Sequence, residues 1–272
     1  MSKIAECLNE YKPIEERLGQ VGINKLGEYM EVVKCYPNYR VDVKFLDGND
    51  CIINIKYDNF RRGIAKNYNR VEYGFHGYLG QGPYVTGYRE NGKKYMTPEF
   101  NVWLSMHRRS ENFNGEKPSY EDVTICKEWW NFQNFAKWYN ENTYNCNERL
   151  CLDKDILIPK NKIYSPEACR LVPDSLNQLF KQQPEKDNNL PIGVYYDNRN
   201  KNKPYRTCKL YYVNEDGEVH LTQESFKTPN EAFELYKSYK EKYIRDCAEF
   251  YKGKIPIEIY NALKNYKFEL YN

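Results

Sequence analysis

The residues of this chain best suited to chemistry lie in the segment L-C-L-D-K-D-I-L-I-P-K-N. Asp153 and Asp155 carry carboxylates two positions apart, and Asn161 adds a side-chain amide. Oxygen donors of this kind bind hard cations such as Mg²⁺. Cleaving a phosphodiester bond also needs a general base, most often histidine, and of the three histidines we keep His107 as the candidate that can approach the carboxylates in space. The alternatives are a solvated turn for the two acids and a hydrogen-bonded core position for His107.

Ordered landmarks surround this segment. Downstream they read Y-S-P-E (164–167), C-R (169–170) and Asn177, and upstream W-x-x-M-x-x-R (103–109) and V-x-x-C-x-E-W-x-x-F-x-x-F (123–135). The order resembles the HNH-like proteins common in phage genomes, whose pattern is L-D-R-x-D followed by Y-x-P-E-N-C-R-W. That resemblance implies an HNH-like nucleic-acid-binding domain over residues 71–183. Family members with an Asp-His pair place the base where this chain has Lys154, so the resemblance implies a degenerate nuclease core.

A locally basic stretch marks the carboxyl-terminal third. Between residues 190 and 212, one acid, Asp197, stands against five basic residues: Arg199, Lys201, Lys203, Arg206 and Lys209. Arg206 and Lys209 are three apart, so on a regular strand they face opposite sides unless the strand bulges. We assign Arg206 to a base-edge contact, with Tyr195 or Tyr211 stacking nearby, and the loop lysines to phosphates. The alternative is a basic hairpin kept for solubility and edge protection.

The elements expected around this stretch are three short strands within 191–196, 204–213 and 218–223, then a helix. Thr228 and Glu231 form a capping box, which predicts a helix from Pro229 through about Lys252. The sequences I-G-V (192–194), Y-R (205–206) and F-x-T-P-x-E-A-F-x-x-Y-K (226–237) resemble the APETALA/ethylene-response-type DNA-binding domain. The resemblance implies such a domain over 189–272, with one sheet face laid into the major groove of double-stranded DNA.

The first seventy residues predict a short helix followed by a small β-rich module. Apolar and polar residues alternate in 41–45 and in 51–57, on either side of an Asp-Gly turn, and this pattern predicts a hairpin. The pattern G-I-N-K-L-G-E-Y-M-E-V-V-K-C-Y, with Y-D-N-F-R-R-G-I-A-K-N, resembles an amino-terminal module of phage HNH-like proteins. Arg61 and Arg62, followed by Lys66 and Arg70, form a solvated charged loop or, as the functional alternative, a phosphate-contacting edge.

Two further segments have clear patterns. The glycine-rich run 73–88 lacks the strand, helix and Lys-Ser/Thr pair of a phosphate-binding loop, and it predicts turns between short strands. Aromatic residues at helical spacing in 123–142 predict an amphipathic helix with a buried stripe. The polar run 181–191 predicts a linker.

Bulk properties bound the class of protein. The 272 residues carry a formal charge of only +3, so a nucleic-acid site must be a local basic face. The nine cysteines contain no C-x-x-C pair, and Cys126 with Cys169 alone cannot complete a four-ligand zinc site. We therefore expect reduced thiols. We also expect the protein to lie in the cytoplasm of the bacterial host, without membrane association. We therefore expect an α+β protein of three small modules: 1–70, 71–183 and 189–272.

Three functions remain open from the sequence. The favoured one is a phage protein that binds double-stranded DNA, with nuclease chemistry degenerate or absent. The second is a Mg²⁺-dependent HNH-like endonuclease or nickase that uses Asp153, Asp155, Asn161 and His107. The third is a counter-defence protein that inhibits a host nuclease complex by protein contact, for which abundant tyrosine is compatible.

Overall fold

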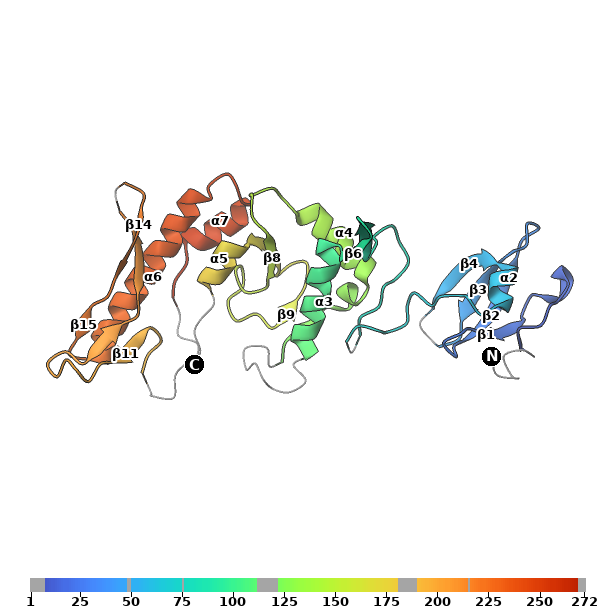
Figure 1. Ribbon diagram of the computed structural model, residues 1–272, viewed down its shortest axis with the longest axis horizontal. Coiled ribbons are helices and arrows are strands. Elements are labelled where there is room, and N and C mark those ends of the chain that lie inside the picture. The colour runs from blue at the N-terminus through green and yellow to red at the C-terminus, as the bar shows by residue number, and fades with distance from the viewer. Residues whose placement is uncertain are drawn as a thin grey trace. The chain divides into compact units, whose positions relative to one another are not determined.

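A computed structural model describes residues 8–47, 50–74, 76–111, 122–180, 190–214 and 216–268 (Figure 1). The chain divides into two compact units, 1–138 and 139–272. Both contain helices and small antiparallel sheets, which confirms the expected α+β class. The finer division into three modules stays a prediction.

The amino-terminal unit begins with a four-stranded antiparallel sheet. Its strands are β1 (Val21–Ile23), β2 (Tyr29–Cys35), β3 (Arg40–Phe45) and β4 (Ile52–Lys56), in that spatial order. The predicted hairpin is confirmed as β3–β4, and alternate residues Val41, Val43 and Phe45 are fully buried. A 3₁₀ turn, η1 (Ile14–Glu16), precedes the sheet, and the short helix α2 (Tyr57–Arg61) follows it.

A buried arginine organises one side of this sheet. Arg17 is only 2% exposed, and its guanidinium lies 3.9 Å from the ring centre of Tyr57, with Tyr11 and Tyr39 at 5.6 and 5.7 Å. Its Nε donates a hydrogen bond to the Lys12 carbonyl at 2.9 Å. Aromatic faces stabilise a desolvated cation. Part of the tyrosine excess therefore serves the fold.

The outer edge of the sheet at β4 is covered by side chains. The Ile52 carbonyl accepts a hydrogen bond from Gln81 Nε2 at 2.7 Å, and the Asn54 carbonyl accepts one from the Arg40 guanidinium at 2.9 Å. Arg40 also donates to the Asn54 side chain. Two carbonyls of an edge strand are thus already paired.

The rest of this unit packs around an aromatic core. Its elements are β5 (Gly87–Glu90), β6 (Lys93–Met96), α3 (Pro98–Glu111), β7 (Thr124–Ile125), η3 (Lys127–Trp130) and the greater part of α4 (Phe132–Asn142), which crosses the boundary at residue 138. Trp103, Trp129, Phe132 and Phe135 are fully buried, as the aromatic spacing predicted.

The single helix expected over 123–142 is wrong in extent, because Asn131 interrupts it. The backbone of Asn131 is extended, and its side chain accepts the hydrogen bond of the Gln133 amide at 2.9 Å. Asparagine in that role starts a helix and does not continue one. The helix α4 accordingly begins at Phe132.

The second unit contains a two-stranded layer and a larger sheet with helices. The layer comprises β8 (Leu150–Asp153) and β10 (Arg170–Pro173), with β9 (Ile163–Tyr164) between them in sequence and α5 (Asp174–Leu179) after them. The carboxyl-terminal elements are β11 (Val194–Tyr196), β12 (Tyr205–Thr207), β13 (Leu210–Val213), β14 (Val219–Thr222), β15 (Ser225–Phe226), α6 (Pro229–Phe250) and α7 (Ile257–Lys264).

Helix α6 connects two hydrophobic clusters of the second unit. Thr228 and Glu231 form the predicted capping box, and the helix ends at Phe250. Its first turns pack with Val194 and Phe268. Its second half packs with Val172 and Leu176 and with buried residues of α7. The sequence reading did not predict α7, although Ile259 and Leu263 have helical spacing and are fully buried.

Candidate nucleic-acid interface

The chain bulges just after the strand that carries the predicted base-contacting arginine, between β12 and β13. Arg206 of β12 lies opposite Ser225 of β15, whereas Leu210 of β13 lies opposite Thr222 of β14, so three residues between the paired positions on one side face two on the other. One extra residue is the definition of a bulge. Thr207 and Leu210 are buried at 0% and 3% exposure, so their neighbours Arg206 and Lys209 project from the face that does not pack on α6. The bulge therefore places both cations on one face.

Thr207 holds the bulge in place. Its amide donates to the Glu224 carbonyl at 2.9 Å, and its hydroxyl accepts the Glu224 amide at 3.1 Å. Gln223 donates from its side chain to the Thr207 carbonyl at 3.1 Å, and the Cys208 amide turns to the Gly193 carbonyl at 2.7 Å. Sequence reasoning did not select Thr207, since these contacts depend on the register of the neighbouring strand.

Asp197 lies between two of the candidate arginines. Arg199 pairs with both of its carboxylate oxygens at 2.8 Å, and Arg206 Nη1 lies 3.9 Å away. The hydrogen bonds from Arg199, with the charge of Arg206, lower the pKa of Asp197 to about 2. In the free protein Arg206 therefore lies beside the Asp197 carboxylate. A DNA phosphate or base that binds Arg206 must displace this carboxylate or share the guanidinium with it.

The other residues predicted for this interface occupy different surroundings. Tyr195 lies opposite Arg206 in the register of β11 and β12, which puts both on one face. Tyr211 is half-exposed, but its ring stacks on Tyr243 of α6 at 5.7 Å. Lys201 and Lys203 are exposed in the loop between β11 and β12, and neither forms an ion pair with another described residue. The structure thus supports Tyr195 over Tyr211 as the aromatic neighbour of Arg206.

The loop that follows β8 is saturated by its own hydrogen bonds. Asp153 accepts the backbone amides of Asp155 and Ile156 at 2.8 and 2.7 Å. The Lys154 side chain is 8% exposed, and its ammonium contacts the Asp155 carboxylate and the Asn161 carbonyl, each at 2.7 Å. Burial raises the pKa of Asp153.

Asn161 closes the same loop with its amide, which donates to the carbonyls of Lys154 and Ile163 at 2.9 and 2.7 Å. The three candidates Asp153, Asp155 and Asn161 therefore lie in one loop, where the Lys154 ammonium contacts Asp155 and the Asn161 carbonyl and backbone amides occupy Asp153. Within the described ranges, no group of three or more His, Cys, Asp or Glu side chains is arranged to hold a metal ion.

His107 lies in the aromatic core of the first unit. It is 3% exposed and contacts Trp103 with ring centres 4.4 Å apart. Burial lowers its pKa to about 4, although a hydrogen bond to the Trp129 carbonyl favours the protonated form. Its Nε2 atom has no hydrogen-bond partner among the described residues. A neutral, enclosed imidazole is typical of a core histidine, and catalysis by His107 stays a prediction.

The basic residues after β4 have partners within the first unit. The Arg61 guanidinium lies over the Tyr11 ring at 5.3 Å, and Arg62 pairs with Asp58 at 3.8 Å. Farther on, Arg70 lies near two glutamates and Lys66 lies over the Tyr68 ring at 5.2 Å. These contacts favour the solvated, locally paired interpretation of this segment.

The eight described cysteines are free thiols, and Cys7 lies outside the described residues. Cys169 is fully buried, as expected of a small hydrophobic side chain.

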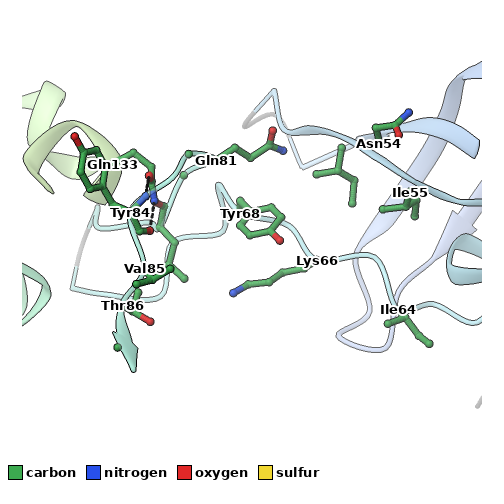
Figure 2. Close-up of a pocket in the computed structure, with 15 residues that line it drawn as sticks. Asn54, Ile55, Ile64, Lys66, Tyr68, Gln81, Tyr84, Val85, Thr86 and Gln133 are labelled. Carbon is green, nitrogen blue, oxygen red and sulfur yellow. Dashed lines mark hydrogen bonds between the residues drawn. The ribbon is translucent and has the colours of Figure 1, made fainter. Parts of the chain in front are cut away.

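An open pocket of about 600 Å³ lies between β4 and the segment 79–87 (Figure 2). Gln133 fixes this segment, since its side chain accepts the Tyr84 amide and donates to the Tyr84 carbonyl, both at 3.0 Å. Of the described residues lining the pocket, Lys66 alone carries a formal charge. Such a lining identifies no ligand class.

No family model, curated protein or solved structure matches the chain. Among the described helices, none has the length and apolar character required to cross a bilayer.

Proposed function

We propose that this protein binds double-stranded DNA through the side of β11, β12 and β13 that lies away from α6, and that it is a phage protein acting in the bacterial cytoplasm. The observation that carries the proposal is the bulge after Arg206, which brings Arg206 and Lys209 onto one face beside Tyr195. The exposed Lys201 and Lys203 extend the same basic stretch. Arginine reads guanine edges in the major groove, and lysines neutralise phosphates.

The loop at 153–163 supports binding without cleavage. A divalent cation would have to displace the Lys154 ammonium from Asp155 and the backbone amides from Asp153. Ammonium and Mg²⁺ repel each other at such separations. We therefore propose that the HNH-like segment is a scaffold, with Mg²⁺-dependent cleavage absent.

The test is fluorescence anisotropy of duplex DNA with the full-length chain at two salt concentrations. Arg206→Ala should cost roughly 1–3 kcal/mol on a preferred sequence, if it reads a base edge. Lys203→Ala should weaken all sequences alike and flatten the slope of log K against log salt by about one. Lys252→Ala, an exposed change beyond the end of α6, is the matched control.

A reverse variant tests the contribution of Asp197. Asp197→Asn removes the carboxylate that lies 3.9 Å from Arg206 and pairs with Arg199, so it should tighten binding and steepen the salt dependence. Unchanged affinity in Asp197→Asn, together with unchanged affinity in Arg206→Ala, would show that this face does not contact DNA.

A further inference from the structure

The hairpin formed by β5 and β6 in the first unit is exposed along both of its strands. Asn91 and Gly92 have φ angles of 50° and 76°, as in the tight turn that suits a two-residue hairpin loop. Every residue from Tyr88 to Met96 is exposed on both faces of the ribbon. Its base is anchored to the rest of the unit, where Thr97 donates hydrogen bonds to the carbonyls of Thr86 and Val85 at 3.2 and 3.1 Å.

One face of this hairpin is basic. Arg89 lies directly opposite Lys94, and neither forms an ion pair with a described residue. Like charges facing each other across two strands destabilise a hairpin. A two-stranded ribbon is also only marginally stable in water. The charge pair therefore opposes the fold of the element that carries it.

The opposite face supplies the stability that the basic face lacks. Tyr88 and Tyr95 are paired in register, and their rings stack with centres 5.6 Å apart at 24°. Glu90 lies opposite Lys93 beyond them, on the same face. The aromatic pair and the opposite charges hold the ribbon, so the Arg89–Lys94 face is left for solvent or a polyanion.

We propose that the β5–β6 hairpin is a second DNA-contacting element, which places Arg89 and Lys94 against phosphates of a duplex. Two antiparallel strands have the width that the major groove of DNA admits. The excess positive charge, without acidic partners on that face, matches a phosphate backbone. Because the hairpin belongs to the first unit, this inference goes beyond the sheet of the second unit and does not depend on it.

The experiment compares three double variants of the full chain by anisotropy of a duplex across a salt series. Arg89→Gln with Lys94→Gln should raise Kd roughly tenfold and flatten the salt slope by about 1.8, which corresponds to two phosphates. Lys127→Gln with Lys252→Gln removes the same charge from two exposed positions and should change neither quantity comparably. Glu90→Gln with Lys93→Gln alters the other face without changing net charge, and should bind as the parent does.

The outcomes separate the two proposals. If the Arg89 and Lys94 variant matches the charge-matched control, the hairpin inference is overturned. If that variant binds weakly while Arg206→Ala with Lys209→Ala binds normally, the hairpin inference holds and the sheet proposal fails. A parent chain that binds no duplex at any salt concentration overturns both. Unfolding curves of the hairpin variants should stay close to that of the parent, since the substituted side chains are exposed and cross-strand charge pairs contribute little to the stability of the whole chain.

Discussion

The side chain of Lys154 occupies the position that a metal ion would need in this loop. Its ammonium group contacts the Asp155 carboxylate and the Asn161 carbonyl. The sequence grouped the two aspartates and Asn161 as candidate ligands, and all three lie in this loop. It could not show that lysine points inward, because lysine side chains are mostly exposed and only the packing of this loop buries this one.

Substituting Lys154 should therefore damage the fold and not an activity. Lys154→Met leaves the Asn161 carbonyl and one Asp155 oxygen without a partner, so the free energy of unfolding should fall by about 2 kcal/mol. Urea denaturation measures this loss, with exposed Lys160→Met as the control.

The paired aspartates give a separate test of catalysis. Asp153→Ala with Asp155→Ala should leave duplex affinity nearly intact, because the proposed DNA contacts lie elsewhere. The parent should not nick supercoiled plasmid with Mg²⁺ or Mn²⁺. Metal-dependent nicking that disappears in the double variant would replace the scaffold interpretation with a nuclease.

His107 makes stability depend on pH. Its pKa is about 4 in the folded chain against 6.5 for the ordinary group, with the Trp129 carbonyl and His76 as its polar neighbours. The unfolded chain takes up the proton first, so this contribution is complete above about pH 6.5 and is lost as pH falls toward 4. The loss amounts to about 3 kcal/mol.

Two measurements check this dependence. Nuclear magnetic resonance titration of the His107 imidazole should give a midpoint near the lowered value. In His107→Gln, unfolding free energy should vary less between pH 7 and pH 4 than in the parent. A midpoint near the ordinary histidine value would contradict the enclosed, neutral state.

At the scale of elements, local signals were the ones that the sequence predicted well. The alternation of apolar and polar residues predicted the β3–β4 hairpin, and the capping box of Thr228 and Glu231 predicted the start of α6. The break between β12 and β13 could not be predicted from the sequence. It depends on how these strands pair with the separate strands β15 and β14, and on the hydrogen bonds of Thr207. For the same reason the sequence left open whether Arg206 and Lys209 share a face.

The cap of α6 can be tested by itself. Thr228→Ala removes the hydroxyl that accepts the Glu231 amide and leaves the Thr228 amide bonded to a less constrained Glu231. Loss of such a cap costs about 1 kcal/mol, measurable as a lower midpoint in thermal or urea unfolding. Ser238→Ala, at an exposed mid-helix position, should stay within a few tenths of a kcal/mol of the parent.

At the scale of the whole molecule, α6 determines which fragments can fold. Its second half and α7 pack on Val172 and Leu176, which lie before the predicted boundary at 189. A fragment of residues 189–272 would expose that cluster to water, so we expect it to unfold at lower urea than a fragment of residues 139–272. Circular dichroism of both fragments measures the difference, and equal midpoints would support 189–272 as an independent domain.

The covered edge at β4 bears on how this protein behaves at high concentration. Unpaired strand edges recruit strands of other molecules and seed aggregates. Here Arg40 and Gln81 already occupy two of the carbonyls that an incoming strand would need. This edge of the amino-terminal sheet is thereby protected from edge-to-edge polymerisation, and a charged guanidinium lies where another chain would have to approach.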